Sequence, residues 1–146
     1  MIRIEGEIVI NRPPEEVFDF IADERNEPLY NPRMRHAEQI SDGPIGVGTR
    51  FRAESASIGR PVEMIIEVTD YERPRRLASS THISTMDIHG ALTFDPVPTG
   101  TQMHWWWDLE PVGSLRLMKP LVASIGRHQE QAIWTSLKHH LEDEAH

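Results

Sequence analysis

The apolar and polar residues between Thr49 and Glu110 alternate, and this alternation constrains the fold more than any other feature of the 146-residue chain. Successive side chains of a β-strand point to opposite faces, so a period of two predicts strands that are buried on one side. The alternation is interrupted by segments typical of turns, among them IGR, ERP and PVPTG. We therefore predict five consecutive strands, over Thr49–Ser57, Pro61–Tyr71, Arg76–Ile83, Thr85–Asp95 and Thr101–Glu110.

The segments before Thr49 predict two further strands and two short helices. IRIEGEIVI alternates like the later strands, and AEQI has the composition of a brief strand. Between them, NRPPEEVFDFIAD predicts a helix because Asn11 can cap it and prolines suit its first turn. ERNEPLYNP predicts a second short, irregular helix that ends at Pro32.

The C-terminal segment after PVGS has helical periodicity to the end of the chain. Ser114 can cap this long helix, and Pro120 predicts a bend because it lies beyond the first turn. Apolar residues recur every three or four positions, which predicts one buried stripe. The stripe comprises Met118, Leu121, Val122, Ile125, Ala132, Ile133, Leu137 and Leu141.

This order of elements predicts a single α+β domain over residues 1–146. About seven antiparallel strands form one sheet, two short helices follow the first strand, and the long C-terminal helix is available to cover one face of the sheet. The length is sufficient for a hydrophobic core without disulfides or metals.

Composition excludes several functions. A net charge of −8 argues against a nucleic-acid-binding protein, which needs a basic surface. The absence of cysteine excludes thiol catalysis and thiolate metal sites, and it suits a reducing cytoplasm. No apolar run has the length of a membrane span, and no signal peptide is recognisable. These features together predict a cytoplasmic protein. Neither a metal nor a cofactor motif is present, so we predict that the protein uses neither.

Three consecutive tryptophans, in the stretch HWWWDLE, lie on the last predicted strand. Trp105 and Trp107 share one face with apolar neighbours, whereas Trp106 shares the other face with Asp108. The apolar face is expected to point to the C-terminal helix. An interior strand face with two indole N–H groups, each requiring a partner, is more typical of a cavity wall than of a featureless core.

Five stretches spread over nearly the whole chain are similar to one protein family: RPPEEVFDFIADERNEPLYNP, SDGPIGVGTRF, VTDYERPRRLASS, PTGTQMHW and SLKHHLE. They resemble the START-like (SRPBCC) superfamily, in its polyketide cyclase/dehydrase-like branch. The resemblance implies a helix-grip fold, in which a curved antiparallel sheet wraps around the C-terminal helix and encloses a cavity. Such cavities usually take a hydrophobic or amphipathic small molecule. Because the family contains cyclases, hydrolases and carriers, the resemblance does not fix an activity.

The expected cavity is enclosed, mostly apolar and roughly 300–1,000 Å³ in volume. Gly126 and Gln129 leave room and supply one polar anchor on the helix wall, where a filled core would carry Leu or Ile. The sheet wall is expected to contain Trp105 or Trp107 together with Met64 and Ile66. The full set of candidate ligand-binding residues is Tyr30, Phe51, Met64, Ile66, Thr81, Ile88, Met103, Trp105, Trp107, Ile125, Gln129 and Ile133.

Three functions remain open from the sequence. The first is binding of a small polyketide-, lipid- or quinone-like molecule. The second is a metal-free cyclase, aromatase or dehydratase, for which His82, Tyr30, Arg50 and Gln129 are the candidate acid–base or polar groups. The third is a protein-interaction module that uses the outward-facing Trp106, and a homodimer stays open as well. No pair of carboxylates is expected on the inward face, which favours binding over catalysis.

Overall fold

The structure, a computed structural model, describes residues 2–56 and 61–143, except for the side chain of Ser114. The end of the predicted strand at Ser57, the IGR turn and the proposed capping by Ser114 therefore lie outside the described residues. The elements are β1 (Ile2–Ile10), α1 (Pro14–Ala22), the 3₁₀ helix η1 (Glu24–Leu29), β2 (Met34–Gln39), β3 (Arg50–Ser55), β4 (Val62–Glu72), β5 (Arg76–Ile83), β6 (Met86–Val97), β7 (Gly100–Pro111), the 3₁₀ helix η2 (Gly113–Met118) and α2 (Lys119–Asp143).

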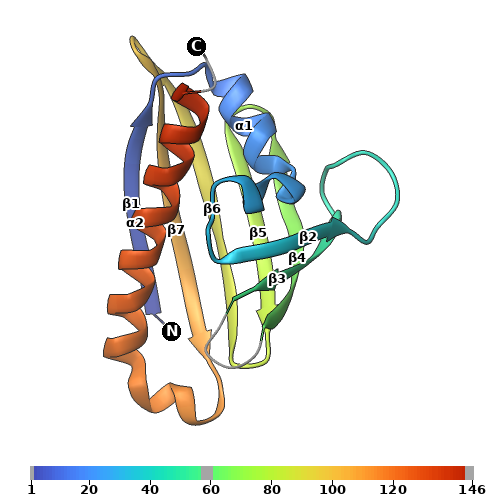
Figure 1. The fold of residues 1–146 in the computed structure, drawn as a ribbon, viewed down its shortest axis with the longest axis vertical. Helices are drawn as coiled ribbons and strands as arrows, with labels where there is room; N and C mark the ends of the chain where they lie inside the picture. The colour runs from blue at the N-terminus through green and yellow to red at the C-terminus, as the bar shows by residue number, and fades with distance from the viewer. Residues whose placement is uncertain (1, 57–60, 144–146) are drawn as a thin grey trace.

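Seven antiparallel strands form one sheet in the order β1-β7-β6-β5-β4-β3-β2. Figure 1 shows α2 running along β1 and β7, with α1 and η1 at the other end of the same layer. This arrangement confirms the predicted α+β class and the helix-grip fold. None of the helices within the described ranges is long and apolar enough to cross a membrane.

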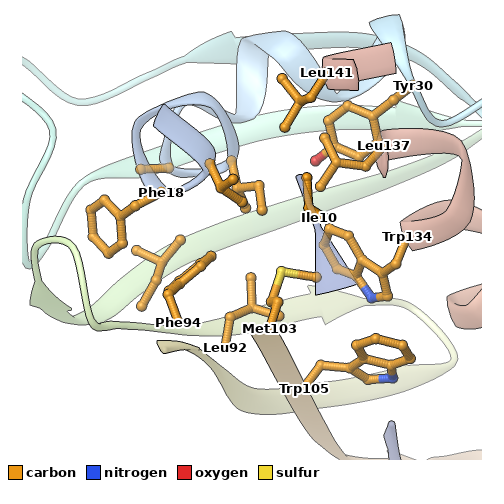
Figure 2. Packing of buried hydrophobic residues seen from close by; sticks show 14 of the residues in the cluster. Ile10, Phe18, Tyr30, Leu92, Phe94, Met103, Trp105, Trp134, Leu137 and Leu141 are labelled. Carbon is orange, nitrogen blue, oxygen red and sulfur yellow. The ribbon is translucent and has the colours of Figure 1, made fainter. Parts of the chain in front are cut away.

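Aromatic side chains hold the helices onto the sheet. Phe18 of α1 packs edge-to-face against Tyr71 and Phe94, with ring centroids 5.1 and 5.3 Å apart. Trp134 of α2 lies next to Trp105 of β7 (Figure 2), and their ring centroids are 6.1 Å apart. Such aromatic pairs add roughly 0.5–1.5 kcal/mol each to the free energy of area burial. The core is therefore anchored at two places, one under each α-helix.

Both α-helices begin differently from the prediction. Pro13, and not Asn11, occupies the N-cap position of α1, and the backbone N–H of Asn11 instead donates to Glu142 at 2.9 Å. The C-terminal α-helix begins only at Lys119, after η2, so Pro120 lies in its first turn. A first-turn proline removes no intrahelical hydrogen bond, which makes the predicted bend unnecessary.

The buried face of α2 also differs from the predicted stripe. Met118, Leu121 and Ile125 are 47%, 49% and 46% exposed. The first turns of α2 lie near the start of β1 (Figure 1), where Val122 and Ile125 line a hollow together with Ile4 and Leu109. Leu137 and Leu141 of the predicted stripe are buried, together with Ala123 and Trp134, which the prediction omitted.

The outer face of β7 carries an ion pair beside Trp106. Arg3 of β1 donates two hydrogen bonds to the buried Asp108 carboxylate, at 2.8 and 2.9 Å. The Arg3 guanidinium also lies over the Trp106 ring, 4.4 Å from its centroid. The hydrogen bonds from Arg3 lower the pKa of Asp108, and the guanidinium covers much of the indole that an interaction module would have to expose.

Candidate ligand-binding site

A cavity of about 220 Å³ lies between the sheet and the helices. Strands β3 to β7 form one wall, α1 and η1 form the roof, and α2 closes the side. Apolar residues dominate the sheet wall, whereas acidic and amide groups come from η1 and α2. The lining residues are Ile21, Ala22, Glu24, Glu27, Asn31, Arg33, Met34, Ser55, Met64, Ile66, Val68, Leu77, Ser79, Thr81, Ile88, Leu92, Trp107, Gln129, Glu130, Ile133 and Trp134.

Two glycines position the inward-facing tryptophans. Gly6 of β1 is the register partner of Trp105, and a Cβ at this glycine would lie 2.4 Å from the Trp105 ring. Gly90 of β6 is the register partner of Trp107, and a Cβ there would lie 2.7 Å from that ring. Each indole therefore lies over a strand position that has no side chain. Trp105 leans toward β1 and the core, and Trp107 leans toward β6 and the cavity.

The predicted alternation of β7 is confirmed. Met103, Trp105 and Leu109 are 5% exposed or less, and Trp107 is half-buried in the cavity wall. The outer residues of the strand face away from the helix. The expectation that at least one of the two inward indoles lines a cavity therefore agrees with the position of Trp107.

Seven of the twelve candidate residues line this cavity: Met64, Ile66, Thr81, Ile88, Trp107, Gln129 and Ile133. Three others, Phe51, Met103 and Trp105, are buried in the core without reaching the cavity. Tyr30 is buried between the rings of Phe20 and Trp134. At about 220 Å³ the cavity is smaller than the predicted range, and Trp134, which the predicted stripe omitted, lines it.

A second hollow of about 230 Å³ adjoins the first, between the N-terminal half of α2 and strands β1, β6 and β7. It contains Ile125 and Gly126, which were predicted for the cavity itself. A Cβ at Gly126 would lie 3.3 Å from Ile4, so this glycine permits close approach of α2 to β1. Four residues, Ile88, Gln129, Glu130 and Ile133, line both hollows and form the partition between them.

Three carboxyl groups that were not predicted to be part of the site line the cavity. Glu24 and Glu27 come from η1, and Glu130 comes from α2. The expectation of no carboxylate pair on the inward face is true of the strands but wrong for the site, since the acids reach it from the helices. Glu130 precedes Trp134 by four positions, so the phase of Trp134, Leu137 and Leu141 would have predicted it inward.

Burial and mutual repulsion raise the pKa of the Glu24 carboxyl well above its usual range, with burial the largest cause and Glu27 the second. Burial also raises the pKa of Glu27, although hydrogen bonds from Asn31 and Glu24 oppose this change. The pair is therefore expected to share a proton that resides on Glu24. Within the described part of the chain, Oε2 of Glu24 is buried without a hydrogen-bond partner.

Glu130 faces two indoles. Its pKa is raised to about 8, first by burial and then by the charge of Glu27, while the N–H groups of Trp134 and Trp107 act in the opposite direction. Both N–H groups thus approach the carboxyl, yet neither has a hydrogen-bond partner of normal geometry among the described residues. At neutral pH this carboxyl is mostly protonated, so the site holds a neutral acid next to two unused donors.

The remaining candidates for acid–base chemistry lie elsewhere. His82 is exposed and pairs with Asp87 near the β5–β6 turn, and Arg50 is exposed on β3. Only Gln129 of the four residues proposed for an enzyme lines the cavity. Over the described ranges, no three His, Asp or Glu side chains are grouped so that they could hold a metal ion.

Solved structures with the same fold cover almost the whole chain. A protein from Thermus thermophilus has a TM-score of 0.84 at 18% identity, covering 99% of both chains. A START superfamily protein from Mycobacterium smegmatis has a TM-score of 0.84 at 12% identity, covering 97% of both. An aromatase/cyclase from Streptomyces sp. R1128 also has a TM-score of 0.84 at 12% identity, covering 99% of this chain and 95% of its own. No curated protein matches the sequence.

The fold is the one that these solved structures share, among them a START superfamily protein and an aromatase/cyclase. The family model described as "Polyketide cyclase / dehydrase and lipid transport" matches residues 1–142. The chain belongs to this family, as the resemblance of its sequence predicted. Membership supports hydrophobic-ligand binding in general, without specifying the ligand.

Proposed function

We propose that this protein binds a small amphipathic molecule in the cavity, with its apolar body against the sheet and its polar end against η1 and α2. The observation that carries the proposal is the division of the cavity wall. Met64, Ile66 and Leu92 supply apolar surface on one side, and Glu130 and Gln129 supply polar groups on the other. Pockets with a mostly apolar lining and a few convergent polar groups are typical ligand sites.

The unpartnered indole N–H groups support the same proposal. A buried donor without an acceptor costs about 1–3 kcal/mol, a cost that a bound ligand or water removes. Trp107 and Trp134 both line the cavity, so an acceptor held there would be within their reach. Buried donors in a hydrophobic core are normally hydrogen-bonded, so two donors without a partner in one cavity wall are more typical of a ligand site than of a core.

Filling the cavity from β5 tests the proposal. In Ser79→Phe the new ring would occupy the space in front of the sheet wall, and we expect the affinity for cavity ligands to fall at least about tenfold. Binding is measured by the change in tryptophan emission during titration with optically transparent fatty acids, alcohols and amines. Trp107 and Trp134 serve as reporters because both lie in the wall.

Ser80→Phe is the matched control. It introduces the same ring at the next residue, which is exposed on the opposite face of the strand, and should leave binding unchanged. A thermal melt of both variants separates loss of binding from loss of folding. Equal affinities for Ser79→Phe and the unmodified protein, or no emission change with any ligand, would contradict the proposal.

A second candidate function is acid catalysis on a carbonyl ligand, and the neutral Glu130 beside two indole donors favours it. A protonated carboxyl can donate to a carbonyl oxygen and thereby promote transfer of the adjacent carbon-bound proton to solvent water, which forms the enol. Exchange of that proton for deuterium in a cyclic ketone, followed by NMR, is expected to be faster with the protein than with Glu130→Gln. Equal exchange rates would exclude this role for Glu130.

The other predictions about the chain's surroundings stay proposals. A cytoplasmic location, the absence of nucleic acid among its partners and a homodimer are each consistent with a chain of net charge −8 without cysteine. Size-exclusion chromatography with light scattering measures the oligomeric state directly. Arg3 covers one face of Trp106, so a dimer contact at that indole would include the Arg3–Asp108 pair.

A further inference from the structure

Among the described residues, no cationic side chain forms an ion pair with the acidic groups of the cavity. Over the described residues, Glu24, Glu27 and Glu130 form no salt bridge, and no cationic group contributes to the pKa of any of them. Arg33 is the single Lys or Arg side chain among the lining residues described, and it is exposed. Three carboxyl groups in one wall without a positive partner carry a desolvation cost, which protonation and the hydrogen bond from Asn31 relieve in part.

An independent observation points to a ligand at the same place. Trp134 is only 5% exposed, lines the cavity, and its Nε1–H has no hydrogen-bond partner within the described residues. Among the described residues, the Nε1–H of Trp107 and Oε2 of Glu24 are also buried without a hydrogen-bond partner. Two donors and one acceptor are therefore left unused around the same acidic groups. An occupant that donates to Oε2 of Glu24 and favours the ionised form of Glu130 would supply the missing donor and make Glu130 a stronger acceptor for both N–H groups.

We propose that the cavity takes an amphipathic amine, with its ammonium group among Glu24, Glu27 and Glu130 and its apolar body against the sheet wall. This inference rests on the proposed function, because it specifies the chemical class of the ligand in the same cavity. An ammonium group has three donors and no acceptor, which matches a wall of three carboxyl groups. Charge-assisted hydrogen bonds of this kind are about twice as strong as neutral ones.

Binding of an amine would also give the N–H groups of Trp107 and Trp134 an acceptor. When an ammonium group approaches, Glu130 loses its proton to solvent and becomes a carboxylate. That carboxylate can accept hydrogen bonds from the N–H groups of Trp107 and Trp134, both of which already face it. The faces of the same rings favour a nearby cation as well. Binding thus converts unused donors and a neutral acid into a hydrogen-bonded ion pair, with release of one proton.

The titratable groups around Glu24, Glu27 and Glu130 determine the pH range over which the affinity for a cationic ligand changes. The titratable groups that act on the cluster or line its cavity come from η1 and its flanks, namely Asp23, Glu24, Glu27, Tyr30 and Arg33. Burial and the same glutamates raise the pKa of Tyr30 well above its usual range, so this phenol stays neutral. Most groups around Glu130 are therefore acidic or neutral. The affinity for a permanently charged quaternary ammonium should rise with pH between about 6 and 9 as the acids ionise.

A series of ligands with one apolar body tests the charge requirement. Adamantylmethylamine, adamantylmethanol and adamantanecarboxylate differ only in the head group and absorb no light used to excite tryptophan. Calorimetric titration at pH 7 is expected to show the amine binding at least about tenfold more tightly than the alcohol, with the carboxylate weakest. Repeating the amine titration in buffers of different ionisation enthalpy should show the release of a proton.

Glu130→Gln should weaken amine binding about tenfold, and by at least about fivefold more than it weakens alcohol binding. Glu67→Gln is the matched control, since Glu67 is exposed on β4 outside the cavity, and it should change neither. Glu24→Gln repeats the test from η1 if Glu130→Gln does not fold. Equal binding of amine and alcohol, or an amine affinity that Glu130→Gln leaves unchanged, would overturn the inference and leave the proposed function intact. Failure of every ligand to bind would contradict both.

Discussion

Gly90→Ala is expected to lower the free energy of unfolding by about 3 kcal/mol or more, the largest effect of any single substitution proposed for this protein. A Cβ at this position would lie 1.9 Å from the carbonyl oxygen of Trp106, an atom of the neighbouring strand. Backbone atoms cannot turn aside as a flexible side chain can, so β6 and β7 would have to separate. Urea denaturation followed by circular dichroism measures the loss.

Gly46→Ala is the control, because a Cβ there meets nothing within 4 Å and its effect should stay within about 0.5 kcal/mol. Gly6→Ala should fall between the two, since its Cβ would meet the Trp105 ring, which can shift. The ranking keeps the test decisive if Gly90→Ala is too unstable to purify. A Gly90→Ala protein as stable as Gly46→Ala would show that β6 and β7 do not pair in the register Gly90–Trp107.

Stability is also expected to fall as the pH rises from about 5 to about 9, by about 2–4 kcal/mol. The pKa of Glu130 is raised from 4.5 to about 8 in the folded protein. A group with a raised folded-state pKa contributes stability that is fully present below the unfolded value and is lost as the pH passes the folded value. The difference between the folded and unfolded pKa of Glu130 corresponds to roughly 5 kcal/mol of stability. Because Glu130 is partly exposed, water reduces this contribution.

Glu130→Gln should remove the part of this pH dependence that Glu130 causes, because an amide does not titrate, whereas the raised pKa of Glu24 leaves a remainder of the same sign. The variant is expected to match the unmodified protein near pH 5 and to exceed it in stability at pH 9. Glu67→Gln, at an exposed position, should keep the full dependence. Denaturant midpoints at several pH values measure it. A Glu130→Gln protein that loses stability with pH as steeply as the unmodified protein would exclude Glu130 as the titrating group.

The strands could be predicted closely from the sequence, since each exposes one face and buries the other. The predicted strand Arg76–Ile83 coincides with β5, and the inward set on β7 is the observed one. The start of α2 could not be predicted in the same way. Its exposed residues Leu121 and Ile125 have the same helical spacing as buried ones. Which side of a helix meets the sheet depends on where the sheet ends, a fact that spacing alone does not contain.

The acidic end of the cavity could not be predicted because it combines segments without strand periodicity. Glu24 and Glu27 lie on a 3₁₀ helix, where their inward direction depends on how η1 packs onto β2. Glutamate in a helix also usually faces solvent, so nothing marked Glu130 as buried except its spacing from Trp134. Local chemistry that contradicts the usual hydrophobic pattern is typical of functional sites.

The position of β1 in the sheet also determines the order in which the protein can fold. Every other pairing joins strands that follow one another in the chain, whereas β1 pairs with β7, Ile10 with Thr101 and Ile2 with Leu109. During synthesis the first strand therefore leaves the ribosome long before its partner exists. Contacts so distant in sequence slow folding and prolong the exposure of an unpaired strand. Glu5 and Glu7 lie on the exposed side of β1. Their negative charges oppose the association of the unpaired strand with other chains before β7 has been synthesised.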